Sequence, residues 1–155
     1  VRLTNESKQK KTFKLYSYVE WALWDALADM TNFQRNFSTG EVEVEESVIY
    51  HKTEYRERRN HFAFYSVNTP TQGFDTDRET FVGLYESVES PRMIQTGTSG
   101  RSIAKGWPPI ASHYLEVSLK PGESKDFIFL LGFVENKTDN KFSAPNVINK
   151  EQAGK

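Results

Sequence analysis

The stretch Glu41-Val-Glu-Val-Glu-Glu-Ser-Val-Ile-Tyr-His-Lys52 decides the fold class. Its first part alternates glutamate with valine, and its last part is rich in β-branched and aromatic residues, which is typical of half-buried strands. Only Glu46 and Ser47 separate the two parts, and a two-residue connection is the length of a tight hairpin turn. The stretch therefore predicts a β-hairpin with Val42 and Val44 facing inward and the glutamates on an exposed face.

Further segments with strand character lie on both sides of this hairpin. They alternate polar and apolar residues or are rich in β-formers, and turn signals with Pro and Gly separate them. The apolar run at 125–134 is nearly continuous, which favours a central strand buried on both faces. Asp75 is expected to cap one helical turn at 76–81. The expected strands outside the hairpin are residues 1–4, 12–20, 61–67, 112–119 and 125–134.

Several short strands, tight turns and long loops predict an all-β protein, an antiparallel β-sandwich with at most one or two short helical turns. We expect the sandwich domain at residues 1–135, incomplete at its N-terminus because Val1 begins as if in the middle of a strand. Residues 136–155 are expected to be a linker or the start of a following segment. The chain is therefore expected to be a piece of a longer protein.

Composition excludes several classes of protein. The 155 residues carry 21 acidic and 20 basic side chains, and a nucleic-acid or anionic-membrane binder would show a clear basic excess. The absence of cysteine excludes disulfides and thiolate metal sites. No apolar run is long enough to span a membrane as a helix. Aromatic residues make up 14% of the chain, so large rings are expected to carry much of the burial.

The segment between the first strands and the hairpin has the composition of a ligand loop. It contains Asn32, Gln34 and Arg35 beside phenylalanines, with Asp25 and Ser38 nearby. Amides and a guanidinium hold sugar hydroxyls, and ring faces hold apolar C–H surfaces. A loop that satisfies its own side chains by internal hydrogen bonds is the alternative.

No complete catalytic set is recognisable in the sequence. Glu41, Glu43 and Glu45 are carboxylates of the kind that a glycosidase pairs, but a solvated strand face explains them better. The three histidines are isolated and are expected to be strand residues rather than metal ligands. The charged cluster at 54–59 favours an ion-pair network over a phosphate or nucleic-acid clamp, since its glutamates partly neutralise its arginines.

Several long motifs carry a resemblance to a known family. They are Trp24-Asp25 followed by Thr31-Asn-Phe-Gln-Arg-Asn-Phe-Ser-Thr-Gly-Glu-Val-Glu-Val44, the segments 48–63 and 73–79, and then 106–113 and 119–123. These motifs resemble the N-terminal β-sandwich domain, of the super-sandwich type and itself part of a larger domain, of the cellobiose phosphorylases in glycoside hydrolase family 94. The resemblance covers nearly all of the chain and is least distinctive after Glu135. Cellodextrin and chitobiose phosphorylases are similar but less close through residues 32–35.

The resemblance implies an enzyme that splits cellobiose with inorganic phosphate, with inversion, into α-glucose 1-phosphate and glucose. Phosphate is the nucleophile and co-substrate, so no other cofactor and no catalytic base are implied, and one carboxylic acid protonates the leaving oxygen. In this family that acid and the phosphate site belong to a separate helical-barrel domain. No catalytic residue is therefore expected here, and the chain alone is expected to be inactive. The resemblance also implies a cytoplasmic homodimer that binds neither nucleic acid nor membranes.

Matched by motif, Asn32, Gln34 and Arg35 are expected near the acceptor-sugar subsite, with Asp25 and Ser38 as further candidates. The sequence leaves open whether this loop acts on its own subunit or on the partner. Two other classes also stay open at this stage. A non-catalytic carbohydrate-binding module would carry an exposed row of coplanar aromatic rings, and a dimerisation domain would leave sugar kinetics independent of Arg35.

Overall fold

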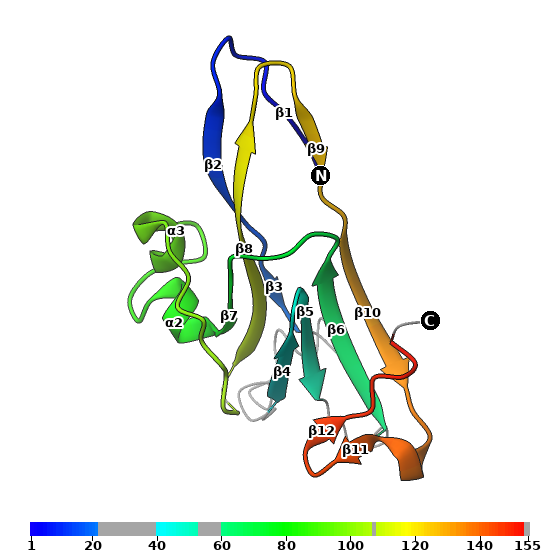
Figure 1. The fold of residues 1–155 in the computed structure, drawn as a ribbon. Helices are drawn as coiled ribbons and strands as arrows, with labels where there is room; N and C mark the ends of the chain where they lie inside the picture. Colours follow the sequence, from blue (N-terminus) through cyan, green and yellow to red (C-terminus); the bar gives the residue numbers. More distant parts are fainter. Residues whose placement is uncertain (22–39, 53–59, 107, 154–155) are drawn as a thin grey trace.

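A computed structural model describes residues 1–21, 40–52, 60–106 and 108–153 (Figure 1). Within these parts of the chain, strands predominate and the two α-helices are short. The elements are β1 (Arg2–Thr4), β2 (Lys11–Tyr16), β3 (Val19–Glu20), β4 (Glu41–Glu45), β5 (Val48–Lys52), β6 (His61–Val67), β7 (Gly73–Asp77), α2 (Arg78–Val82), α3 (Arg92–Thr96), β8 (Pro109–Leu119), β9 (Ser124–Asp126), β10 (Phe129–Glu135), a 3₁₀ turn (Thr138–Asn140), β11 (Phe142–Ala144) and β12 (Val147–Ile148).

Two antiparallel sheets form the sandwich. In the first sheet β8 pairs with β2 and β3 along one side and with β7 along the other. In the second sheet the order is β10-β6-β5-β4. The hairpin β4–β5 has the predicted bounds, with Glu45 opposite Val48, and Glu46 has the positive φ of 52° that tight hairpin turns require. The prediction of an all-β antiparallel sandwich is confirmed.

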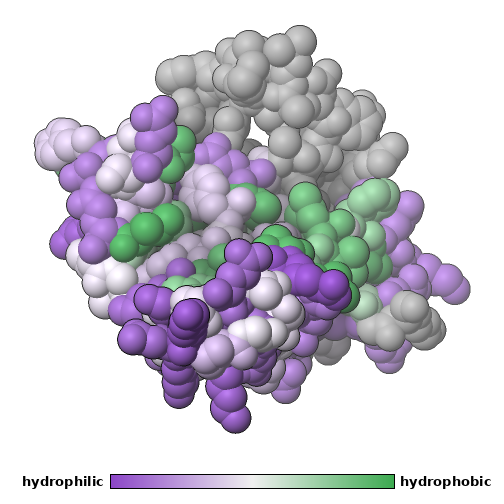
Figure 2. All heavy atoms as spheres, turned by 90° about the horizontal axis from the view of Figure 1, so that it is seen from above, coloured by the Kyte–Doolittle hydropathy of each residue, from purple (hydrophilic) through white to green (hydrophobic). Residues whose placement is uncertain are grey.

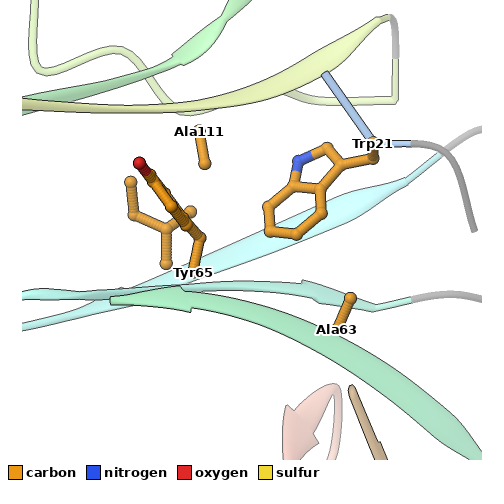
Figure 3. Packing of buried hydrophobic residues seen from close by; sticks show 5 residues of the cluster. Trp21, Ala63, Tyr65 and Ala111 are labelled. Atoms are coloured by element: carbon orange, nitrogen blue, oxygen red, sulfur yellow. The ribbon is translucent and has the colours of Figure 1, made fainter. Parts of the chain in front are cut away.

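The core lies between the two sheets. One cluster joins Trp21, Ala63, Tyr65 and Ala111 with Ile49 (Figure 3). A second cluster, further along β8, joins Leu115, Val117 and Leu119 to Val67 and Phe127. Side chains on one face of β8 therefore meet those on one face of β5 and β6, as alternation in a half-buried strand requires.

Each sheet is also covered on its outer face. Phe81, Val82 and Met93 of the two helices pack on Ile110, so α2 and α3 cover the first sheet beside β7 and β8 (Figure 1). Ile148 of β12 packs on Tyr50 and Phe62 of the second sheet. The described part of residues 136–155, expected to be a linker or the start of a following segment, thus contains a hairpin packed on the sandwich. The domain boundary at residue 135 stays a prediction.

The helix cap expected at Asp75 lies two residues before the cap that the structure shows for α2. Asp77, not Asp75, caps α2, and its Oδ1 accepts a hydrogen bond from the Thr80 amide at 2.7 Å. Asp75 lies in β7 and is 1% exposed. Its carboxylate accepts hydrogen bonds from the amides of Gly100 and Ser102 and from the Ser102 hydroxyl, so it holds the loop that follows α3.

The prediction of a central strand at residues 125–134 is wrong. This segment divides into β9 and β10, and β10 pairs with β6 alone among the described strands. Large apolar side chains along it are exposed, and Figure 2 shows apolar surface on the side of the molecule where β10 lies. These side chains are Ile128, Leu130, Leu131 and Phe133. The apolar run correctly predicts a strand, but it does not show how many neighbouring strands pair with it.

The glutamates of β4 are not uniformly solvated. Glu41 and Glu45 are exposed as predicted, but the side chain of Glu43 is only 16% exposed because the β11–β12 segment covers it. No helix in the described ranges is long and apolar enough to cross a membrane.

Candidate functional site

The candidate sugar-binding loop runs between two described points, Trp21 and Gly40. The predicted site residues lie between them and therefore outside the described residues, so their assignment stays a prediction. They are Asp25, Asn32, Gln34, Arg35 and Ser38. The charged cluster at 54–59 lies outside the described residues as well. The structure does describe the frame that holds both ends of this loop.

The first end of the loop is anchored in the first sheet. Val19 and Glu20 of β3 pair with Ala111 and Ile110 of β8, and the chain then reaches Trp21. The Trp21 side chain is 9% exposed and packs between the two sheets (Figure 3). Burial of an indole of this size is worth about 2–3 kcal/mol, so the point at which the loop leaves the first sheet is fixed.

A polar cluster supports this first end from outside. The Glu20 carboxylate accepts hydrogen bonds from Arg78 Nε at 2.9 Å and from the Tyr18 hydroxyl at 2.6 Å. Burial, together with this bond to Glu20, raises the pKa of Tyr18 well above its ordinary value. The phenol therefore stays protonated and keeps donating to Glu20 throughout the physiological range.

The second end of the loop is anchored in the second sheet. Gly40 is buried and leads directly into β4, and Glu41 also forms an isolated antiparallel bridge with Lys105. A Cβ atom at position 40 would overlap the imidazole ring of His51. Glycine is therefore required here for close approach of the backbone to a side chain.

His51 lies between the two ends. Its side chain is 3% exposed, and its ring centroid is 5.3 Å from that of Trp21. Burial lowers the pKa of His51 to about 4, so the imidazole is neutral at pH 7. His51 Nδ1 and Trp21 Nε1 are both buried and have no hydrogen-bond partner among the described residues.

Charged side chains fix the outer face of the same hairpin. Glu43 Oε1 lies 3.0 Å from Lys52 Nζ and accepts a hydrogen bond from the Ile148 amide at 2.9 Å, while Oε2 lies 3.1 Å from Lys150 Nζ. Burial by itself would raise the pKa of Glu43, but the amide and the two ammonium groups outweigh it and hold the pKa below its usual value. The ionised carboxylate thus ties the C-terminal hairpin to β4 and β5.

These carboxylates act as structural groups in this arrangement. Glu43 and Glu45 pair with Lys150, and Glu41 lies 3.5 Å from Lys52, as expected of a strand face rather than of a glycosidase pair. His51, His61 and His113 all lie in strands, as predicted. In the described ranges, no three His, Asp or Glu side chains gather as a metal site would require.

Sequence reasoning missed the frame around the loop. Trp21 is not among the predicted site residues, and His51 is predicted only to be a strand residue. The signal for Gly40 was present, because a glycine that precedes a strand often marks a close backbone approach. The contact between Trp21 and His51 joins residues from different sheets, so no local pattern reveals it.

This fold, with the two described ends of the predicted loop at Trp21 and Gly40, defines a β-sandwich domain, and the family can now be assigned. The chain belongs to the family described as "Glycosyl hydrolase 94, supersandwich domain", whose family model matches residues 1–152. The expectation of a family 94 sandwich domain is therefore confirmed, at the level of the family.

Curated relatives agree with this assignment. The chain is 26% identical over 134 residues to a solabiose phosphorylase from Paenibacillus borealis. It is 24% identical over 133 residues to an N,N'-diacetylchitobiose phosphorylase from Vibrio proteolyticus, and 23% identical over 134 residues to one from Vibrio furnissii. Each match covers 85% of this chain but only 17% of the relative.

Proposed function

We propose that this chain is the sandwich-domain portion of a glycoside phosphorylase that cleaves cellobiose with inorganic phosphate. The products would be α-glucose 1-phosphate and glucose, formed with inversion. The observation that carries the proposal is the family match over residues 1–152, together with relatives that are disaccharide phosphorylases. The preference for cellobiose rests on the long motifs around Trp24, residues 31–44 and residues 48–63.

In this proposal the chain selects and orients sugar but does not break the bond. Residues Asn32, Gln34 and Arg35, with Asp25 and Ser38, line the acceptor subsite. Buried amides and a guanidinium reject a sugar that leaves them unpaired, so such a loop discriminates hydroxyl positions. The acid catalyst and the phosphate site belong to a helical-barrel domain of the same enzyme, and the whole protein acts as a cytoplasmic homodimer.

A panel of phosphorolysis reactions tests the substrate. The whole enzyme is incubated with phosphate and, separately, cellobiose, cellotriose, N,N'-diacetylchitobiose and solabiose, and release of the sugar 1-phosphate is measured. We expect the largest kcat/KM with cellobiose. A preference for the diacetylated sugar or for cellotriose would support the chitobiose or cellodextrin alternative, and no phosphorolysis of any of these sugars would contradict the proposal.

A carbohydrate-binding module is the second class of function. Such a module needs neighbouring exposed rings, but the exposed aromatic side chains of the described parts lie in three different segments of the chain. Tyr85 follows α2, Phe133 lies on β10 and Phe142 lies on β11. Calorimetric titration of cellobiose into the 155-residue chain separates the two classes. We expect no heat of binding, and tight binding to the chain alone would favour the module.

A further inference from the structure

We propose that His51 is a positioning residue that fixes both ends of the segment 22–39 and thereby sets the acceptor selectivity of the enzyme. The inference rests on the proposed function, because it assigns to the described frame a role in that same acceptor subsite. It adds residues that lie outside the predicted sugar contacts: His51, with Trp21 and Gly40 as its two partners.

The position of His51 in the sandwich is the first argument. It lies near the end of β5, opposite Val42 in the ladder with β4, and its side chain is buried on the core side. Trp21 follows β3, which belongs to the first sheet, whereas Gly40 precedes β4, which belongs to the second. The His51 ring touches both, so one side chain spans the gap between the two sheets at the points where the segment leaves and returns.

The contact with Gly40 is the second argument. The imidazole occupies the volume that a Cβ at position 40 would fill, so the backbone at this end of the segment approaches the ring more closely than any other residue type permits. On its other side the ring packs on the indole of Trp21, at a centroid distance of 5.3 Å and a tilt of 37°. A shift of either end would have to displace a buried ring.

The His51 ring is held in place by close packing. His51 Nδ1 makes no hydrogen bond to a described residue, and the ring is in close contact with the Gly40 backbone and the Trp21 indole. The pair Gly40–His51 therefore acts as a steric lock. Small displacements of the groups that orient a substrate have large kinetic effects, so loosening this lock should alter acceptor discrimination without touching the bond-breaking groups.

His113 offers a matched control. It is also a histidine in a buried strand position, at 1% exposure, and burial likewise lowers its pKa to about 4. Its ring packs on Tyr65 and Phe129, with centroid distances of 5.0 and 6.3 Å. Its ring contacts are with Tyr65 and Phe129 and not with Trp21, and the atoms nearest to a Cβ at position 40 belong to His51. Removal of its ring disturbs the same core away from the ends of the segment.

The experiment compares acceptors in the synthetic direction. The whole enzyme receives α-glucose 1-phosphate with either glucose or xylose, and phosphate release gives kcat/KM for each acceptor. We expect His51→Ala and Gly40→Ala each to change the glucose-to-xylose ratio by about tenfold, with acceptor KM affected more than kcat. His113→Ala should lower the melting temperature at least as much as His51→Ala and leave the ratio within about twofold.

Stability of the 155-residue chain supplies a second readout that needs no activity. If the steric lock exists, His51→Ala makes room for the new methyl group, so Gly40→Ala costs less stability in the His51→Ala background than in the wild type. Additive effects of the two substitutions would overturn the lock, as would an unchanged acceptor ratio in an active His51→Ala enzyme or equal changes of that ratio in His51→Ala and His113→Ala. The milder His51→Gln serves if His51→Ala does not fold. A wild-type enzyme that releases no phosphate would instead defeat the proposed function itself.

Discussion

The burial of strands β8 and β10 is the reverse of what their sequences suggest. β8 contains Ser112, His113, Glu116 and Ser118, yet residues 110–115 are buried without a break. β10 is the more apolar strand, yet Leu131 is 58% and Phe133 is 67% exposed. Burial therefore follows the neighbours that a strand acquires and not its mean hydropathy.

The neighbours of β8 explain why its polar groups are tolerated. Strands pair along both of its sides, the helices cover one face and the second sheet covers the other. Two of the polar groups of His113 are paired inside this environment, because Ser17 Oγ lies 3.1 Å from its Nδ1 and accepts a hydrogen bond from its amide at 3.0 Å, while its buried Nε2 has no partner among the described residues. A buried polar group that is paired in this way costs little.

The neighbours of β10 explain its exposure. Leu131 lies opposite Tyr65, and Phe133 lies opposite Ala63, whose side chains belong to the core. Both β10 side chains are therefore on the inner face of the second sheet, at an edge that the described strands of the first sheet do not cover. β8 is thus covered by its neighbours, whereas β10 is not covered by the described strands of the first sheet.

Matched leucine truncations should show the largest difference between the two strands. Leu115→Ala in β8 removes a side chain that is 2% exposed, and we expect a loss of about 2–5 kcal/mol from the free energy of unfolding. Leu131→Ala in β10 should cost less than about 1 kcal/mol. Urea denaturation of the two variants measures both values. Equal losses would show that β10 is buried in solution.

The buried histidines predict a pH dependence of intermediate size. Burial lowers the pKa of His113 to about 4 from 6.5, with a smaller opposing effect of the Ser47 carbonyl. Above pH 6.5 the imidazole is neutral in both states and the stability is full. As the pH falls from 6.5 towards 4, only the unfolded chain takes up the proton, so at pH 5 His113 alone should cost about 2 kcal/mol.

Urea denaturation at pH 7 and pH 5 measures this loss. His51 has the same direction of shift, to about 4, so the wild type should lose the contribution of both rings and His113→Gln only that of one. A wild-type chain that is equally stable at both pH values would contradict the buried, neutral state of these histidines.

The cover on the outer face of the second sheet should depend on Glu43. Glu43→Gln removes charge from contacts with Lys52 and Lys150, and we expect a loss of about 1 kcal/mol at pH 7. Because the pKa of Glu43 is lowered in the folded chain, this contribution is present above pH 4.5 and is lost as the pH falls below it. Glu41→Gln is the control, since that side chain is 63% exposed, and it should change stability by less than about 0.5 kcal/mol. Equal effects of the two substitutions on the melting temperature would contradict a stabilising role of the Glu43 ion pairs.

The smallest effect on stability is expected from charges placed on β10. Leu131→Lys with Phe133→Lys should change the free energy of unfolding by no more than about 1 kcal/mol, because both positions are largely exposed. The same change should reduce self-association of the chain at high concentration, since an apolar edge strand is a template for pairing. Light scattering and urea denaturation on one preparation test both expectations. A large loss in the free energy of unfolding would contradict the description of β10 as an uncovered edge strand.

Local pattern predicted local structure well. The hairpin β4–β5 and strand β6 have the predicted bounds, because alternation and a two-residue turn depend only on neighbouring residues. The short strands β7, β11 and β12 were not expected. β11 and β12 have only two or three residues, and β7 contains Gly73, Asp75 and Asp77, which are residue types that strands disfavour. The cap at Asp77 instead of Asp75 depended on which of two nearby carboxylates reaches the Thr80 amide.

Contacts between residues far apart in the chain could not be predicted from the sequence. The place of β10 in its sheet and the cover over Glu43 both depend on segments far away in the chain, so no window of residues contains them. For the site, residue chemistry singled out the segment that holds Asn32, Gln34 and Arg35, and the family resemblance suggested the function proposed for it. Trp21 and His51 were missed because their contact joins two sheets.

The acceptor role proposed for the loop is tested most directly by Arg35→Ala in the whole enzyme. Acceptor kinetics are measured in the synthetic direction, with α-glucose 1-phosphate saturating and glucose varied. Loss of charged hydrogen bonds to a sugar predicts an acceptor KM raised about tenfold or more. An unchanged acceptor KM together with an unchanged turnover would contradict the assignment of this chain to the acceptor subsite.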